Sequence, residues 1–335
     1  MRKPYKIAAA FLMLLIIALG ASACTAKTPE LEKFEGTRSL MDTYVTITVY
    51  ADDDSAGEAM DAAFARMGEM EKVASIFDQE SEAFKLNQNG YLDEPSNDLF
   101  KLVVTSLYYS KLTGGYFDIT VQPLLDLWAG GLWEESPEVQ QDKIEETMKF
   151  VGWDKINIEG DKIYFGADGM EMTLGGIAKG YAVDEAIRVL RSMGIEHGLV
   201  NAGGDMSTIC SRADGEPWSV ALENPDDTNQ CLAIFKISGK SIATSGNYER
   251  YFNPEKTAHH IINPKTGYSA NECISATIIG ENCMQVDALA TAVFVMGPEK
   301  GISLVESLPD VECFIIDVER TTYSSSGLSR YLSKE

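Results

Sequence analysis

The segment Thr173–Asp184 (TLGGIAKGYAVD) is the stretch around which the rest of the chain can be organised. It predicts the end of a strand, a turn at Gly175-Gly176 and the first turns of a helix. Apolar side chains continue at helical spacing through Ala178, Ala182, Ala186, Val189, Leu190 and Met193. A helix that begins after glycines exposes backbone N–H groups, which favour a bound phosphate. The alternative is that the pair only makes a tight strand-to-helix turn.

A second glycine-rich loop follows closely and strengthens the phosphate interpretation. Gly194 is expected to end the helix, and a short apolar strand at Leu199-Val200 then leads into Asn201–Asp205 (NAGGD). One Gly-Gly pair could be an ordinary turn. Two glycine-rich loops in succession favour phosphate binding more strongly.

The composition indicates a folded, strongly acidic protein. The chain has 335 residues, 45% of them hydrophobic, and a net charge of −23. Such a surface repels nucleic acid and anionic lipid headgroups, so neither is expected as a partner. An anionic substrate would need a local helix N-terminus, lysine or metal ion to offset that charge.

The first residues have the pattern of a targeting segment. Basic residues precede an apolar run over Ile7–Leu19, then small residues, then Cys24. An ordinary cleaved signal peptide is one explanation; the other is a bacterial lipobox, with Cys24 lipidated after cleavage. We expect the lipoprotein, although Ala21 stands where leucine is usual. The predicted organisation is a signal peptide over 1–23, a tether over 24–35 and a single domain over 36–335.

The remaining cysteines do not indicate a zinc site or a disulfide framework. They are five in number and form no CxxC pair: Cys210, Cys231, Cys273, Cys283 and Cys313. We expect most of them to be thiols of the core.

The order of the predicted elements favours an α+β fold, because strands and helices do not alternate regularly as in a doubly wound sheet. Helices are expected over Ser55 to about Phe77, from a cap at Asn97 or Asp98 to Gly114-Gly115, from Ser136 to about Val151, over Val286–Val295 and over Glu299–Leu308. Strands are expected over Asp42–Tyr50, Lys155–Ile158, Lys162–Phe165, Glu171–Leu174, Trp218–Leu222, Leu232–Ile237, Ser241–Thr244, His260–Ile262, Cys273–Ile279 and Cys313–Val318.

Asp287 and Thr291 are candidate metal ligands. They lie four residues apart in VDALATAVFVMG and share one face of the predicted helix. A carboxylate and a hydroxyl are hard oxygen ligands that suit Mg²⁺. The alternative is an aspartate that complements the helix dipole and a threonine bonded to its own backbone.

His260 is a candidate general base. The chain has three histidines, and this one lies in HHIINPKTG between a predicted strand and a Pro/Gly turn. It could accept a proton, contact phosphate or fill a partly buried position at a strand end. Lys179 could likewise reach phosphate or face solvent.

Taken together, the motifs resemble the ApbE family of FAD:protein FMN transferases. Residues from about Gly36 to Val318 keep the family's order of motifs: Met41-Asp-Thr43, Phe77 before Ser81–Asn87, GGYFDITVQPL, TLGGIAKGYAVD, NAGGD, SGNYER, HHIINPKTG and DALAT. Eight motifs in order are far more specific than any one alone. The resemblance implies an ApbE-like, T-fold-like architecture with mixed or antiparallel sheets and packed helices.

The resemblance also implies a reaction and a set of site residues. Family members split FAD, attach FMN through a phosphoester to a threonine or serine of a target protein and release AMP, with Mg²⁺ required. Targets are typically membrane redox subunits outside the cytoplasm. By position in the motifs, the metal would be held by the carbonyl of Ala178 and the side chains of Asp287 and Thr291. The nucleotide would lie near Met41, Phe77, Tyr116, Phe117, Asp118, Lys179 and Asp184, and His260 would assist the acceptor hydroxyl.

The expected protein is therefore a Mg²⁺-dependent FMN transferase, lipid-anchored at Cys24 on the outer face of the cytoplasmic membrane. Two alternatives remain open: an FAD pyrophosphatase that uses water in place of the threonine, and a lipoprotein that binds flavin without chemistry. One departure from the family pattern is Asp42, which stands where Met-Gly-Thr has glycine.

Overall fold

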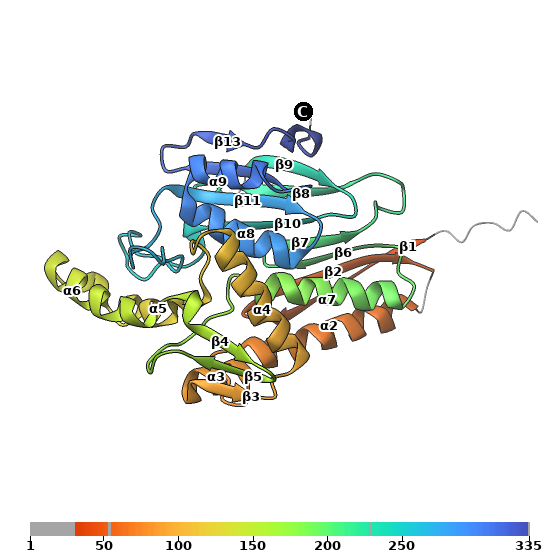
Figure 1. The fold of residues 1–335 in the computed structure, drawn as a ribbon. Helices are drawn as coiled ribbons and strands as arrows, with labels where there is room; N and C mark the ends of the chain where they lie inside the picture. Colours follow the sequence, from red (N-terminus) through yellow and green to blue (C-terminus); the bar gives the residue numbers. More distant parts are fainter. Residues whose placement is uncertain (1–30, 53–54, 228–229, 334–335) are drawn as a thin grey trace, which may run out of the picture.

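An eight-stranded antiparallel sheet forms the centre of the computed structural model, which describes residues 31–52, 55–227 and 230–333 (Figure 1). The strands in spatial order are β1 (Glu32–Leu40), β2 (Thr43–Ala51), β6 (His197–Ala202), β7 (Asp205–Ile209), β10 (Ser241–Gly246), β11 (Cys273–Gly280), β12 (Glu312–Asp317) and β13 (Thr322–Ser324). Each neighbouring pair is antiparallel. The chain therefore builds the sheet from hairpins and longer returns.

Helices and two small sheets surround this sheet. The helices are α2 (Ser55–Ala74), α3 (Glu82–Asn89), α4 (Asn97–Leu112), α5 (Gln122–Ala129), α6 (Pro137–Thr147), α7 (Ala178–Ser192), α8 (Cys283–Met296) and α9 (Pro298–Glu306). The small sheets are β3 (Tyr91–Asp93), β5 (Lys162–Phe165) and β4 (Ile156–Glu159), and separately β8 (Trp218–Glu223) with β9 (Cys231–Ile237). This mixture confirms the predicted α+β class.

The central strands are covered on both faces. Every residue of β11 is buried, and its side chains alternate between two hydrophobic clusters. Ala276 and Ile278 belong to the main core with α7 and α8. Ile279 faces the other way, into a cluster with Trp218 and other residues of β8 and β9. Ile274 belongs to the same cluster because a register shift between Cys273 and Ser275 interrupts the alternation there. The helices and the β8–β9 hairpin thus enclose the sheet from opposite sides.

Helices α7 and α8 approach each other closely at Gly180. A Cβ atom added there would lie 2.4 Å from the carbonyl oxygen of Cys283 and 2.8 Å from the Cβ of Asp287. Just beyond, the carboxylate of Asp184 accepts the backbone N–H groups of Cys283 (2.7 Å) and Met284 (2.9 Å), at the start of α8. Asp184 of α7 therefore holds the first turn of α8 in position.

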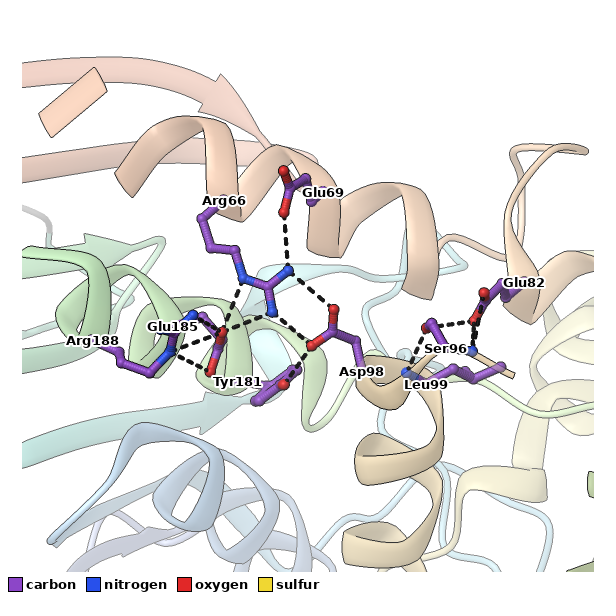
Figure 2. Close-up of polar contacts among 9 residues, drawn as sticks. All are labelled: Arg66, Glu69, Glu82, Ser96, Asp98, Leu99, Tyr181, Glu185 and Arg188. Atoms are coloured by element: carbon purple, nitrogen blue, oxygen red, sulfur yellow. Dashed lines mark hydrogen bonds and ion pairs between the residues drawn. The ribbon is translucent and has the colours of Figure 1, made fainter. Parts of the chain in front are cut away.

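A network of charged side chains ties α7 to α2 and α4 (Figure 2). Arg66 of α2 donates to Asp98 of α4 (2.6 Å) and to Glu185 of α7 (2.7 Å). Tyr181 of α7 also donates to Asp98, at 2.7 Å, and Arg188 donates to Glu185, at 2.8 Å. We call these five residues the Arg66 network. It links three helices through bonds made by side chains of opposite charge.

An arm made of α5 and α6 extends from the body of the molecule (Figure 1). It has its own hydrophobic cluster, in which Leu124, Trp128 and Ile144 pack with Ile262 from the loop after β10. The indole N–H of Trp128 donates to the carbonyl of Gly267 at 2.8 Å. The arm therefore supports the loop that carries His260.

Most predicted elements are confirmed within a few residues, but several predictions are wrong. Glu171–Leu174 is not a strand, since the side chain of Asn87, and not a neighbouring strand, bonds to both the N–H and the carbonyl of Met172, each at 2.8 Å. His260–Ile262 makes only isolated bridges. The side-chain cap of α4 is Ser96, which accepts the N–H of Leu99, and not Asn97 or Asp98.

Other differences concern ends and short elements. Strand β1 begins at Glu32, inside the stretch predicted as a tether, because it pairs along its whole length with β2. Helix α6 ends at Thr147 and a 3₁₀ turn continues to Phe150. The prediction had no counterpart for β1, β3, β7, β13, α3 or α5.

The described cysteines carry no disulfide. All five are free thiols, with Cys210 and Cys231 exposed and the other three buried. Cys24, the predicted signal peptide and most of the predicted tether lie outside the described residues. In the part of the chain that the structure describes, none of the helices combines the length and the apolar character needed to cross a bilayer.

Candidate active site

A cavity of about 690 Å³ lies where eight parts of the chain meet. They are the β1–β2 turn, the end of α2, residues 116–126, the start of α7, the β6–β7 turn with the end of β10, and α8 with the loop before β11. Ten predicted site residues line it: Met41, Phe77, Tyr116, Phe117, Asp118, Ala178, Lys179, His260, Asp287 and Thr291. The fold thus brings together motifs spread over some 250 residues of sequence.

The three predicted metal ligands meet at the contact between α7 and α8. Asp287 and Thr291 lie one turn apart on α8, and Ala178 is the first residue of α7. The carboxylate of Asp287 accepts the N–H of Gly180 at 2.9 Å. The hydroxyl oxygen of Thr291 would lie 2.9 Å from a Cβ built at Gly176, so the Gly-Gly turn leaves room for it. Ser245 lies at 3.4 Å from the same hydroxyl.

The charge around Asp287 favours a bound cation. Asp287 is 5% exposed, and burial, with the nearby charge of Asp205, raises the pKa of its carboxyl well above the ordinary value. A buried carboxylate beside a second one is unfavourable unless positive charge compensates it. Among the described residues no three His, Cys, Asp or Glu side chains are grouped as metal ligands. A metal here would therefore combine one carboxylate with hydroxyl and carbonyl oxygens, a set that fits Mg²⁺.

Lys179 supplies one positive charge to this cluster. It lies in the first turn of α7, and its Nζ is 2.5 Å from a carboxylate oxygen of Asp205. Burial alone would lower the pKa of Lys179, but Asp205 and Asp287 raise it above its ordinary value. Asp205, the first residue of β7, is the residue that the sequence prediction missed: it ends the quoted NAGGD motif but had no role assigned to it.

His260 lies in the loop between β10 and β11 and is half-buried. Its Nδ1 is 3.2 Å from the carbonyl oxygen of Arg250, so Nδ1 carries the proton and Nε2 is left with a free lone pair. Burial, more than any other cause, lowers the pKa of His260 to about 4. The imidazole is therefore neutral at physiological pH and able to accept a proton. Its neighbour His259 instead bonds to Ala270 within the core, at 2.7 Å.

Aromatic side chains lie at the edge and the wall of the cavity. Phe77 is 75% exposed, an unusual position for a phenylalanine with no ligand. Tyr116 accepts a bond from Lys300 Nζ at 2.9 Å, and Lys265 Nζ lies 4.6 Å from its ring centre. Phe117 is buried beneath Gly176. These rings could hold a planar heterocycle between them.

Asp118 and Asp184 differ from the other predicted nucleotide residues. Asp118 lines the cavity, but its carboxylate already accepts the N–H and hydroxyl of Thr120 and the N–H of Trp153, at 2.8, 2.6 and 2.9 Å. Asp184 is not among the lining residues; it caps α8. The structure does not bring Asp184 to the cavity. Asp184 can affect the cavity only by holding the start of α8 in position.

Some of the N–H groups that were expected to be free at the start of α7 already make hydrogen bonds within the protein. Gly180 donates to Asp287, and Ala178 donates to the carbonyl of Leu174 at 2.8 Å. This helix end therefore binds an anionic side chain of the protein itself, in the way that was predicted for phosphate.

Comparisons with known proteins show the family to which the chain belongs. The model of the ApbE family matches residues 41–315, and the chain belongs to that family. A curated relative from Vibrio cholerae, named FAD:protein FMN transferase, is 32% identical over 79% of this chain and 82% of its own length. A relative of the same name from Haemophilus influenzae is 31% identical over 69% of this chain and 70% of its own.

A solved structure shows the same fold. The crystal structure of the ApbE protein from Thermotoga maritima superposes with a TM-score of 0.81 and 28% identity, covering 90% of this chain and all of the other. The match covers nine-tenths of this chain, so the predicted ApbE-like architecture is confirmed.

Proposed function

We propose that this chain is an FAD:protein FMN transferase that needs Mg²⁺. It would move FMN from FAD to a threonine or serine hydroxyl of a target protein and release AMP. Membership of the ApbE family and the names of the curated relatives support the transferase activity. The observation that carries the proposal is that the buried Asp287, the half-buried Thr291 and His260 line one cavity.

In the proposed reaction, the acceptor oxygen attacks the FMN phosphorus of FAD. A new O–P bond forms, the P–O bond to AMP breaks, and the hydroxyl proton passes to Nε2 of His260. Asp287, Thr291 and the carbonyl of Ala178 would hold Mg²⁺, which offsets the charge of the pyrophosphate and polarises the phosphoryl group. Lys179 adds positive charge on the same side of the cavity.

The remaining predicted residues would bind the nucleotide. The exposed ring of Phe77 and the ring of Tyr116 offer surfaces for stacking against the flavin or the adenine. Asp118 shapes the wall between them through its bonds to Thr120 and Trp153. Asp184 would contribute by fixing the start of α8, and so the position of Asp287.

The proposed location is the outer face of the cytoplasmic membrane, through a lipid on Cys24. The basic start, the apolar run and the small residues before Cys24 support it. The acceptor would then be an extracytoplasmic flavoprotein, such as a subunit of a membrane redox complex.

The test uses the soluble chain from Thr25 onward with FAD, Mg²⁺ and an acceptor domain of a redox-complex subunit. Intact-mass spectrometry of the acceptor should show a gain of one FMN. An acceptor with its threonine replaced by alanine should gain nothing. An unmodified acceptor, with FMN and AMP in solution, would instead establish FAD hydrolysis. Bound FAD with neither product would establish a flavin-binding protein.

A further inference from the structure

The further inference concerns Asp205, which lies beside the proposed metal ligands and has no role in the reaction above. Its side chain is 3% exposed, and one carboxylate oxygen lies 2.5 Å from Nζ of Lys179. The contact is shorter than most bonds between charged groups and lies on the cavity wall. A buried carboxylate held in this way has a defined position that a surface ion pair lacks.

The backbone around Asp205 is unusually well fixed. A two-residue turn, Gly203-Gly204, joins β6 to β7, and both glycines have positive φ, 60° and 100°. A Cβ at Gly203 would lie 2.4 Å from the hydroxyl of Thr43, so only glycine fits. The side chain of Asn201 accepts the N–H of Gly204 at 2.9 Å. The NAGGD motif thus places the carboxylate of Asp205 at one point on the cavity wall.

Lys179 has a second carboxylate within electrostatic range. Asp287 also acts electrostatically on its ammonium group, after Asp205. Yet among the described residues the ion pair that Lys179 makes is with Asp205. The backbones of α7 and α8 are held together by the close contact at Gly180, so only the flexible lysine side chain decides which carboxylate it pairs with.

We propose that Asp205 is a positioning residue that holds Lys179 away from Asp287 and so leaves Asp287 free to bind Mg²⁺. The inference rests on the proposed function, because it concerns the metal site of that reaction. Without Asp205, Lys179 turns to Asp287, whose carboxylate already acts on its charge, and competes with the metal for its oxygens. Lys179 would also leave the position in which it faces the phosphates.

The test is a double-mutant cycle with Mg²⁺ affinity as its readout, measured by calorimetry with Mg²⁺ alone. Asp205→Asn keeps the shape of the side chain and should raise the Kd for Mg²⁺ at least tenfold. In a Lys179→Met background the competing cation is gone, so the same change should raise Kd less than threefold. Lys179→Met alone should not weaken Mg²⁺ binding.

A matched control removes another carboxylate from the cavity wall. Asp42 has positive φ, 57°, which asparagine tolerates. Asp42→Asn should change the Kd for Mg²⁺ less than twofold. Thermal unfolding without Mg²⁺ confirms that each variant is folded before it is titrated.

Two results would overturn the inference while leaving the proposed function standing. One is an equal loss of Mg²⁺ affinity from Asp205→Asn with and without Lys179, which would make Asp205 act on the metal directly. The other is no loss in either background. If the wild-type protein itself bound no Mg²⁺, the proposed metal site would fail and the inference with it.

Discussion

Helix α7 contributes to two clusters of charged side chains that have similar composition but different proposed roles. In its middle, the Arg66 network joins one arginine to Asp98 and Glu185 (Figure 2). In its first turn, Lys179 faces Asp205 and Asp287. Each cluster thus combines a cation with two carboxylates that act on it, and each connects α7 to neighbouring elements.

The carboxylates of the two clusters differ in how well they are compensated. Burial alone would raise the pKa of Asp98, but bonds from Arg66 and Tyr181 bring it below its ordinary value. Burial alone would also raise the pKa of Glu185, but bonds from Arg188 and Arg66 bring it below its ordinary value. At Asp287, burial and Asp205 leave the pKa raised. The first cluster is complete without a ligand, whereas the second lacks positive charge, as a cation-binding site should.

The largest expected effect is at the incomplete cluster. Asp287→Asn removes the charged metal ligand while keeping the shape of the side chain. Mg²⁺-dependent turnover of FAD should fall about 10⁴-fold, since metal ions contribute several kcal/mol to such reactions. Steady-state kinetics with FAD and varied Mg²⁺ measure it. Turnover within tenfold of the wild-type rate would remove Asp287 from the metal site.

The complete cluster should respond in stability instead of activity. Arg66→Met leaves Asp98 and Glu185 near each other without their shared cation. Breaking such a pair costs about 3 kcal/mol of the free energy of unfolding. Urea denaturation measures it, and the folded variant should keep kcat within about twofold. If the loss were below about 1 kcal/mol, the network would be no more than a set of surface ion pairs.

The same network predicts a dependence on pH. Because the pKa values of Asp98 and Glu185 are lowered in the folded protein, their contribution is present above the ordinary values of 3.8 and 4.5. It is lost as the pH falls through the lower, folded-state values. The free energy of unfolding of the wild-type protein should therefore fall more steeply below pH 4.5 than that of Arg66→Met. Parallel pH profiles of the two proteins would contradict this.

Part of the candidate site could be predicted from the sequence, and the reasons are local. Asp287 and Thr291 share a face because they are four residues apart on a helix with a clear apolar pattern. Ten of the predicted site residues line one cavity because the family's motifs keep their order. These inferences need only helical periodicity or the resemblance.

The rest depended on contacts between distant segments. The sequence predicted a strand at Glu171–Leu174, but Asn87 supplies the hydrogen bonds that a neighbouring strand would make. The role of Asp184 as a cap of α8 involves a partner about 100 residues away. Nothing local in NAGGD indicates that Asp205 would meet Lys179.

His260 should have a smaller effect than Asp287. His260→Ala should lower the rate of FMN transfer to the acceptor about 10²-fold, within the range of general base catalysis. Because the pKa of His260 is about 4, its neutral form prevails from pH 6 to 8, and the wild-type transfer rate should not fall through its protonation until the pH approaches 4. Intact-mass time courses at several pH values measure it. A wild-type rate that halves near pH 6.5 would show that another group, or a differently placed His260, acts as the base.

The smallest expected effect is at the cavity edge. Phe77→Ala should raise the Kd for FAD about tenfold, because stacking contributes about 1.4 kcal/mol. The side chain is 75% exposed, so the free energy of unfolding should not change. Quenching of flavin fluorescence measures the Kd. An unchanged affinity would show that Phe77 does not contact the nucleotide.

The most direct test of the contrast is thermal unfolding of the wild-type protein and Asp287→Asn with and without Mg²⁺. We predict that Asp287→Asn has the higher Tm without Mg²⁺, because it removes a buried, undercompensated carboxylate. Mg²⁺ should then raise the Tm of the wild-type protein and leave that of Asp287→Asn unchanged. A wild-type Tm that does not respond to Mg²⁺, together with a lower Tm for Asp287→Asn in its absence, would contradict the account: Asp287 would then be a structural residue like those of the Arg66 network.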